Sequence, residues 1–101
     1  MTQETGTPSR EPQDWRHDPA LWAHYVVWLM DDPSNAKEPG GFAEALMRAI
    51  IHADETNREL LAIGFPAAVW AVRTYKNVDN GLNTLRKLAG LPQREQYPLA
   101  D

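Results

Sequence analysis

The tripeptide Gly64-Phe65-Pro66 divides the most helical part of the chain and limits what it can fold into. Glycine readily takes the left-handed conformation that closes many helices, and proline is favoured in the first turn of a helix. We therefore expect one helix to end with Gly64 in the left-handed conformation and another to begin at Pro66. Phe65 is expected to fold back onto the preceding helix. The sequence thus predicts two short helices joined by a tight turn.

Other turn and cap signals divide the rest of the 101-residue chain. Asp18-Pro19 is typical of a helix start, and Asp54 is a credible cap that would separate two helices, although a continuous helix through His52 is an alternative. Gly90 should close the last helix. We predict an all-α, single-domain bundle of four to five short helices over residues 18–90, with a flexible polar arm (1–17) and a loose tail (91–101); the expected helices are 19–30, 42–52, 55–63, 66–76 and 82–89.

The apolar patterns predict which faces are buried. Residues 19–30 are apolar nearly all round, so the helix should be central to the fold or partly a subunit interface, with a homodimer as one option. Trp15 should dock back onto the domain, the alternative being contact with a partner. The residues expected to face inward from helix 42–52 are Phe42, Ala45, Leu46, Ala49, Ile50 and Ala53.

Four large apolar residues form the candidate interaction surface. Met47 and Ile51 lie off the main apolar stripe of their helix, and Trp22 and Trp28 belong to the helix with more apolar surface than a small domain easily buries. The alternative is that all four belong to the core. Alanine substitution of each tryptophan distinguishes the two interpretations.

Composition argues against several classes of protein. Ten Lys and Arg against fourteen Asp and Glu give a net charge of −4, so nucleic-acid binding is disfavoured. The chain has no Cys and no apolar stretch typical of a signal peptide or membrane span, which favours the cytoplasm. A helix-turn-helix around Gly64 remains an alternative, but the second helix offers no Arg, Lys, Asn or Gln before Arg73.

The sequence predicts no catalytic, cofactor or metal site. The nearest metal constellation is His52 with Asp54, joined by Glu44 or His24, and it lacks the paired-histidine spacing of a helical zinc site. The Ser and Thr residues have no base positioned beside them. We therefore expect a protein that is not an enzyme.

One combination of residues resembles a family of small, uncharacterised bacteriophage and prophage proteins, notably of actinobacteria. The match comprises Gly41-Phe42, Ala45-Leu46, Ala49, Ala53-Asp54, Asn57, Leu60 or Leu61, Gly64-Phe65-Pro66, Val69 and Tyr75. The resemblance implies a phage product acting in the host cytoplasm and carries over no catalytic residue. We expect a small accessory protein that binds a phage or host protein. The alternatives are a self-associating structural protein and a DNA-binding regulator.

Overall fold

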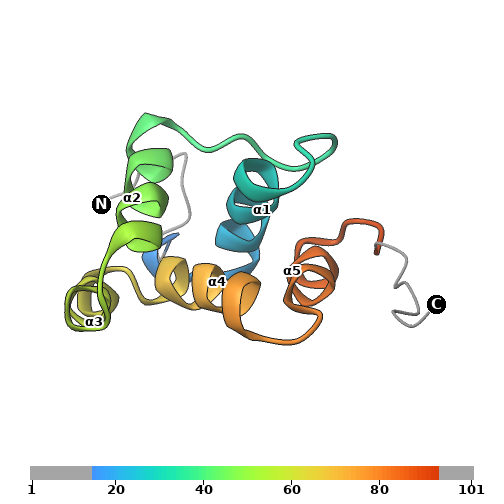
Figure 1. Cartoon of the computed structure of the whole chain (residues 1–101). Coiled ribbons are helices and arrows are strands. Elements are labelled where there is room, and N and C mark those ends of the chain that lie inside the picture. The colour runs from blue at the N-terminus through green and yellow to red at the C-terminus, as the bar shows by residue number, and fades with distance from the viewer. Residues whose placement is uncertain (1–14, 94–101) are drawn as a thin grey trace, which may run out of the picture.

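The computed structural model describes residues 15–93, and within them the chain forms five α-helices, one short 3-10 turn and no strand (Figure 1). The predicted all-α bundle is confirmed. The expected flexible arm and loose tail fall mostly on residues 1–14 and 94–101, outside the described residues. The elements are η1 (Trp15–His17), α1 (Pro19–Met30), α2 (Gly41–His52), α3 (Glu55–Gly64), α4 (Pro66–Asn77) and α5 (Gly81–Ala89).

Helix α4 is the centre of the bundle, because it contacts η1 and all four other α-helices. Figure 1 shows it between α3 and α5, which lie at opposite edges of the molecule. Its buried positions include Ala67, Ala68 and Ala71, whose small side chains let neighbouring helices approach closely. The alanine-rich sequence of α4 therefore suits its central place.

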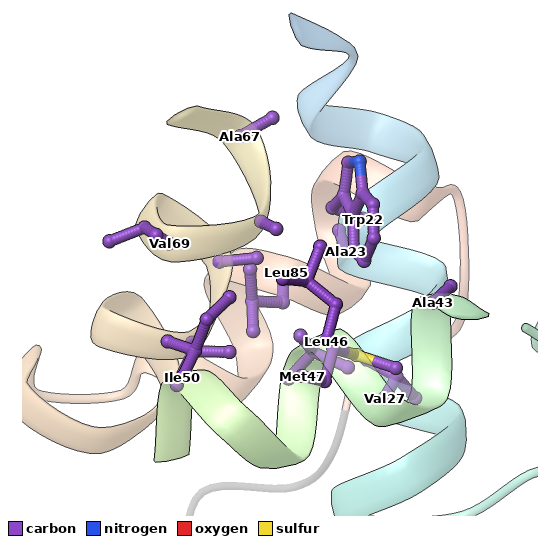
Figure 2. Close-up of a cluster of buried hydrophobic side chains, with 14 of the residues drawn as sticks. Trp22, Ala23, Val27, Ala43, Leu46, Met47, Ile50, Ala67, Val69 and Leu85 are labelled. Atoms are coloured by element: carbon purple, nitrogen blue, oxygen red, sulfur yellow. The ribbon is translucent and has the colours of Figure 1, made fainter. Parts of the chain in front are cut away.

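The hydrophobic core is supplied by α1, α2, α4 and α5, whose buried side chains gather in one cluster (Figure 2). Trp22 from α1 and Met47 from α2 are both 0% exposed. Helix α3 has no buried residue. The largest fully buried side chains are Trp22, Met47, Ile50, Leu85, Val26, Val27 and Val69.

Aspartate side chains cap two helices as predicted. The Asp18 Oδ1 atom accepts a hydrogen bond from the Leu21 amide (3.2 Å), and the Asp54 Oδ1 atom accepts one from the Asn57 amide (2.8 Å). Each bond satisfies an amide that has no partner within its own helix. The cap at Asp54 begins a new helix, so α2 and α3 are separate.

The expected left-handed conformation at Gly64 is wrong. Gly64 still belongs to α3, and Gly90 is the one glycine with a positive φ among the described residues. Phe65 makes the turn instead: its amide donates to the Leu61 carbonyl (2.8 Å), and its own carbonyl accepts from the Val69 amide (3.2 Å). Its φ of −136° is negative, so the turn does not require a glycine at this position.

The inward face of α2 also differs from the prediction. Leu46 and Ile50 are buried as expected, but Ala43 and Met47 are buried beside them, while Phe42, Ala45 and Ala49 are exposed. Leu46 and Ile50 fit both the predicted and the observed buried face of α2. On the helix they lie between the exposed residues and the newly buried Ala43 and Met47. Met47 thus fills the core, while Phe42 packs against Phe65 and Trp15 at the start of the helix.

Gly90 ends α5 as predicted. Its φ is +78°, its amide donates to the Lys87 carbonyl (3.1 Å), and the next amide, of Leu91, donates to the Arg86 carbonyl (2.8 Å). This pair of bonds is the Schellman motif, in which the residue after the glycine usually makes an apolar contact. Leu91 is accordingly buried in the core, so the packed domain extends one residue beyond the expected boundary at Gly90.

Gly81→Ala is expected to destabilise the protein by about 2 kcal/mol or more, because the turn between α4 and α5 leaves no room for a side chain. A Cβ atom at Gly81 would lie 1.9 Å from the backbone oxygen of Thr74. Gly41→Ala is the matched control, since nothing lies within 4 Å of a Cβ atom there. Urea unfolding measures both variants; equal stability of Gly81→Ala and wild type would contradict the close approach.

Candidate functional site

The four residues of the expected interaction surface do not form one in the structure. Trp22 and Met47 are 0% exposed, so both are core residues and unavailable to a partner. Ile51 is half-buried and packs against the core, and Trp28 is also half-buried. The alternative interpretation, in which these apolar residues are core, therefore describes Trp22 and Met47. Neither residue belongs to the candidate surface.

The most exposed large apolar residues lie instead on α2 and α3. Phe42 is 60% exposed, Leu60 59% and Ile63 79%. Ala45 and Ala49 are exposed along the same side of α2 as Phe42, at helical spacing. Large exposed apolar patches mark interaction sites more often than isolated apolar residues do. We call Phe42, Ala45, Ala49, Leu60, Ile63 and the groove between the two helices the α2–α3 face.

An open groove of about 430 Å³ runs between the two helices. Ala49 and Ala53, one turn apart, leave room on the α2 side because their side chains are small. Two groove residues, His52 and Asn57, can offer hydrogen bonds from the rim. The lining residues are Ala49, His52, Ala53, Asn57, Leu60 and Leu61.

Arg58 links α3 to the end of α2. Its guanidinium donates to the Ile50 carbonyl (3.3 Å) and the Ala53 carbonyl (2.6 Å), which satisfies backbone oxygens at the end of α2. Glu55 pairs with Arg58 (3.1 Å) and with Arg73 of α4. The groove is thus held between helices that are bonded to each other and to the centre of the bundle.

Aromatic side chains border the face at the start of α2. The ring of Phe42 lies 5.7 Å from that of Phe65 and 6.3 Å from that of Trp15, measured between centroids. Trp15 also stacks on Trp22, whose Nε1 atom donates to the Trp15 carbonyl (2.9 Å). The predicted docking of Trp15 is confirmed, and Phe65 packs on these rings as well as closing the turn.

A second groove, of about 380 Å³, lies on another part of the surface. It lies where η1 ends and α1 begins, beside the first turns of α4 and near the end of α5. Its large apolar members, Trp70 and Leu88, are less exposed than the three on the α2–α3 face. The lining residues are His17, Pro19, Pro66, Ala67, Trp70 and Leu88.

The position of α4 argues against its use as a DNA-reading helix. A recognition helix must present several side chains to the major groove, whereas α4 is buried along Ala67, Val69 and Val72. Arg73, the first basic residue of α4, is paired with Glu55. The geometry therefore gives no support to the helix-turn-helix alternative.

The histidines lie apart from one another. His52 is exposed in the groove, whereas the Nδ1 atom of His24 accepts a hydrogen bond from the Lys37 amide (3.2 Å). Among residues 15–93, no three His, Asp or Glu side chains come together as metal ligands would. None of the helices in this part of the chain is long and apolar enough to cross a bilayer.

Stability is expected to fall as the pH drops below about 6.5, in part because of His24. Burial and the nearby positive charge of Lys37 lower the pKa of His24 from its ordinary value of 6.5, against an opposing hydrogen bond to the Ala89 backbone. As the pH falls, the unfolded chain therefore binds a proton at His24 at a higher pH than the folded chain does. The contribution of neutral His24 to stability is complete above pH 6.5 and is lost below it.

Thermal unfolding between pH 5.5 and 7.5 tests the role of His24. His24→Gln should make the dependence of Tm on pH shallower over this range. His52→Gln is the matched control for the loss of one imidazole, because His52 is exposed. An unchanged pH dependence in His24→Gln would contradict this role.

The α2–α3 face combines exposed apolar side chains, a groove, and hydrogen bonds from Arg58 that link its two helices. No protein-family model matches the chain, and neither the search of curated proteins nor that of solved structures found a match.

Proposed function

We propose that this chain is a non-catalytic binding module that attaches to another protein through the α2–α3 face. The observation that carries the proposal is the exposure of Phe42, Leu60 and Ile63 on α2 and α3, together with the groove between these helices, which Leu60 lines. Apolar anchors in a fixed frame lose little conformational entropy on binding, which is how small interfaces gain affinity. An amphipathic helix laid into such a groove is a common mode of protein recognition.

The energetics set a minimum size for the interface. Complete burial of a Leu, Ile or Phe side chain contributes about 1.5–3 kcal/mol, so the three anchors together supply about 5 kcal/mol from their exposed state. Association costs on the order of 4–15 kcal/mol before any net affinity appears. The partner must therefore also cover the alanines of the groove and make hydrogen bonds at its rim, where His52 and Asn57 lie.

We also propose that the chain is a phage or prophage product that binds a phage or host protein in the bacterial cytoplasm. The resemblance to small bacteriophage proteins supports this context. Several of the residues that carry the resemblance line the groove, as expected if they serve binding. They are Ala49, Ala53, Asn57 and either Leu60 or Leu61, of which Leu61 also packs against the core.

Affinity capture with matched variants tests the binding role. Leu60→Glu places a charge on the α2–α3 face at an exposed helical site, where the cost to folding is small. Val78→Glu is the control, because Val78 is 50% exposed at the far end of α4. A partner captured by wild type and Val78→Glu should be lost with Leu60→Glu. Equal capture by all three would contradict the proposed surface.

A further inference from the structure

We propose that His24 is a pH-operated latch: its neutral imidazole holds the segment of residues 33–40, and its protonated imidazole releases it. The segment joins α1 to α2, and its last residue, Gly40, is the N-cap of α2. The proposal concerns this connection alone and is independent of the binding role of the α2–α3 face.

The imidazole of His24 lies between the segment and the end of α5. Its Nδ1 atom accepts a hydrogen bond from the Lys37 amide (3.2 Å), so Nε2 carries the proton of the neutral ring. The ring also forms a hydrogen bond with the Ala89 backbone, and Nε2 is the nitrogen left to donate to the Ala89 carbonyl. One neutral imidazole therefore joins two segments that are far apart in the sequence.

The bond from Lys37 is the long-range hydrogen bond of the segment. The Ser34 and Ala36 amides donate to groups two and three residues earlier in the chain (2.9 and 3.1 Å). Among the described residues, the Lys37 bond is the one hydrogen bond that ties residues 33–40 to a distant part of the sequence. Ala36 packs against the core and Pro39 is buried, so release should mobilise the backbone around Lys37 without unfolding the domain.

Protonation of His24 breaks one of its two bonds and keeps the other. An imidazolium ring carries N–H on both nitrogens and has no acceptor, so Nδ1 would then face the Lys37 amide donor to donor. The bond to the Ala89 carbonyl survives, and a charged donor makes it stronger. Burial and the charge of Lys37 lower the pKa of His24, so the release takes place below pH 6.5.

Lys37 is the charged residue that acts on the imidazole, and it stays positive throughout this pH range. Residues 19–30, which form α1, include no Asp, Glu, Lys or Arg. The other charged residues of α5 and of the connection between α1 and α2 are exposed or are bonded to another group. They are Asp31, Asp32, Glu38, Arg86 and Lys87.

Nuclear magnetic resonance of the 15N-labelled protein between pH 5 and 7.5 is the first test. The Lys37 amide resonance should shift with the same midpoint as the His24 ring, and the heteronuclear NOE of residues 34–38 should fall at the acid end. Residues 78–81, which form the turn before α5, are the control and should keep their NOE values. A Lys37 amide that does not titrate, or that titrates with a different midpoint from His24, would overturn the proposal.

Two variants of His24 separate the lost acceptor from other effects of pH. His24→Asn places a carboxamide oxygen near the position of Nδ1, so residues 34–38 should stay ordered and their pH response should disappear. His24→Ala has no acceptor, so the same residues should be mobile at pH 7.5 already. Order in His24→Ala equal to that of wild type at pH 7.5, or an unchanged pH response in His24→Asn, would show that His24 is not the latch.

Lys37→Gln tests the charge that acts on the latch. It keeps the backbone amide and removes the positive charge, so the His24 ring and the residue 37 amide should titrate together at a higher pH than in wild type. Lys87→Gln, at an exposed lysine of α5, is the control and should leave both midpoints unchanged. Movement of the His24 midpoint without the residue 37 amide would contradict the coupling between them.

Discussion

Trp22→Ala is expected to lower the free energy of unfolding by about 3–5 kcal/mol, a large fraction of the stability of so small a domain. Trp22 is 0% exposed at the centre of the core, and its Nε1 atom donates to the Trp15 carbonyl. The substitution therefore leaves a cavity, removes one of the two hydrogen bonds to the Trp15 carbonyl, and removes the ring on which Trp15 stacks. Chemical denaturation followed by circular dichroism at 222 nm measures the loss.

Trp28→Ala is the matched control for Trp22→Ala. Trp28 lies in the same helix but is half-buried, so its removal should cost about 1–2 kcal/mol. Equal losses in the two variants would contradict the assignment of Trp22 to the core.

Asp31→Ala is expected to cost about 3–5 kcal/mol, because it leaves the buried guanidinium of Arg86 without its counter-charge. The Arg86 Nη1 atom lies 3.0 Å from the Asp31 Oδ2 atom, and both side chains are largely buried. Arg86 also donates to the Pro92 carbonyl, so the same guanidinium joins the end of α1 to the segment after α5. Thermal and chemical unfolding both report the loss.

An exposed ion pair provides the control for Asp31→Ala. Glu44 and Arg48, 2.9 Å apart on the surface of α2, should contribute only about 0.3–0.5 kcal/mol, so Glu44→Ala should be nearly neutral. The double variant Asp31→Leu with Arg86→Met should regain much of the stability lost by Asp31→Ala alone. If Asp31→Ala loses no more stability than Glu44→Ala, the Asp31–Arg86 pair is unimportant for folding.

Local signals in the sequence predict the helix boundaries well. Asp18, Asp54 and Gly90 act on backbone groups within a few residues, so their effect depends little on the rest of the fold. Gly64 shows the limit of this reasoning, because Phe65 closes the turn with a negative φ and leaves the glycine helical.

Burial is predicted less well, since it depends on where neighbouring helices lie. Leu46 and Ile50 are compatible with two faces of α2, and the position of α4 and α1 decides between them. The choice that buries Met47 also exposes Phe42 and Ala49, and it thereby creates the α2–α3 face. The expected interaction surface around Trp22 and Met47 could not be corrected from the sequence alone. The positions of the neighbouring helices are needed to show that both residues are buried.

The role of Arg58 also depends on tertiary geometry. Its guanidinium reaches the carbonyls of Ile50 and Ala53 only because α3 turns back beside the end of α2. A basic residue shortly after a break between two helices is the one sequence signal that could have indicated this contact.

Thiol labelling measures most directly whether the α2–α3 face is a binding surface. Leu60→Cys and Val78→Cys each give the chain a single thiol, because the natural sequence has none. The rate of maleimide labelling is compared between dilute purified protein and the cells that produce it. If a partner protein covers the face in cells, Leu60→Cys should react several-fold more slowly there relative to Val78→Cys. Equal slowing of the two variants would contradict the proposed binding surface.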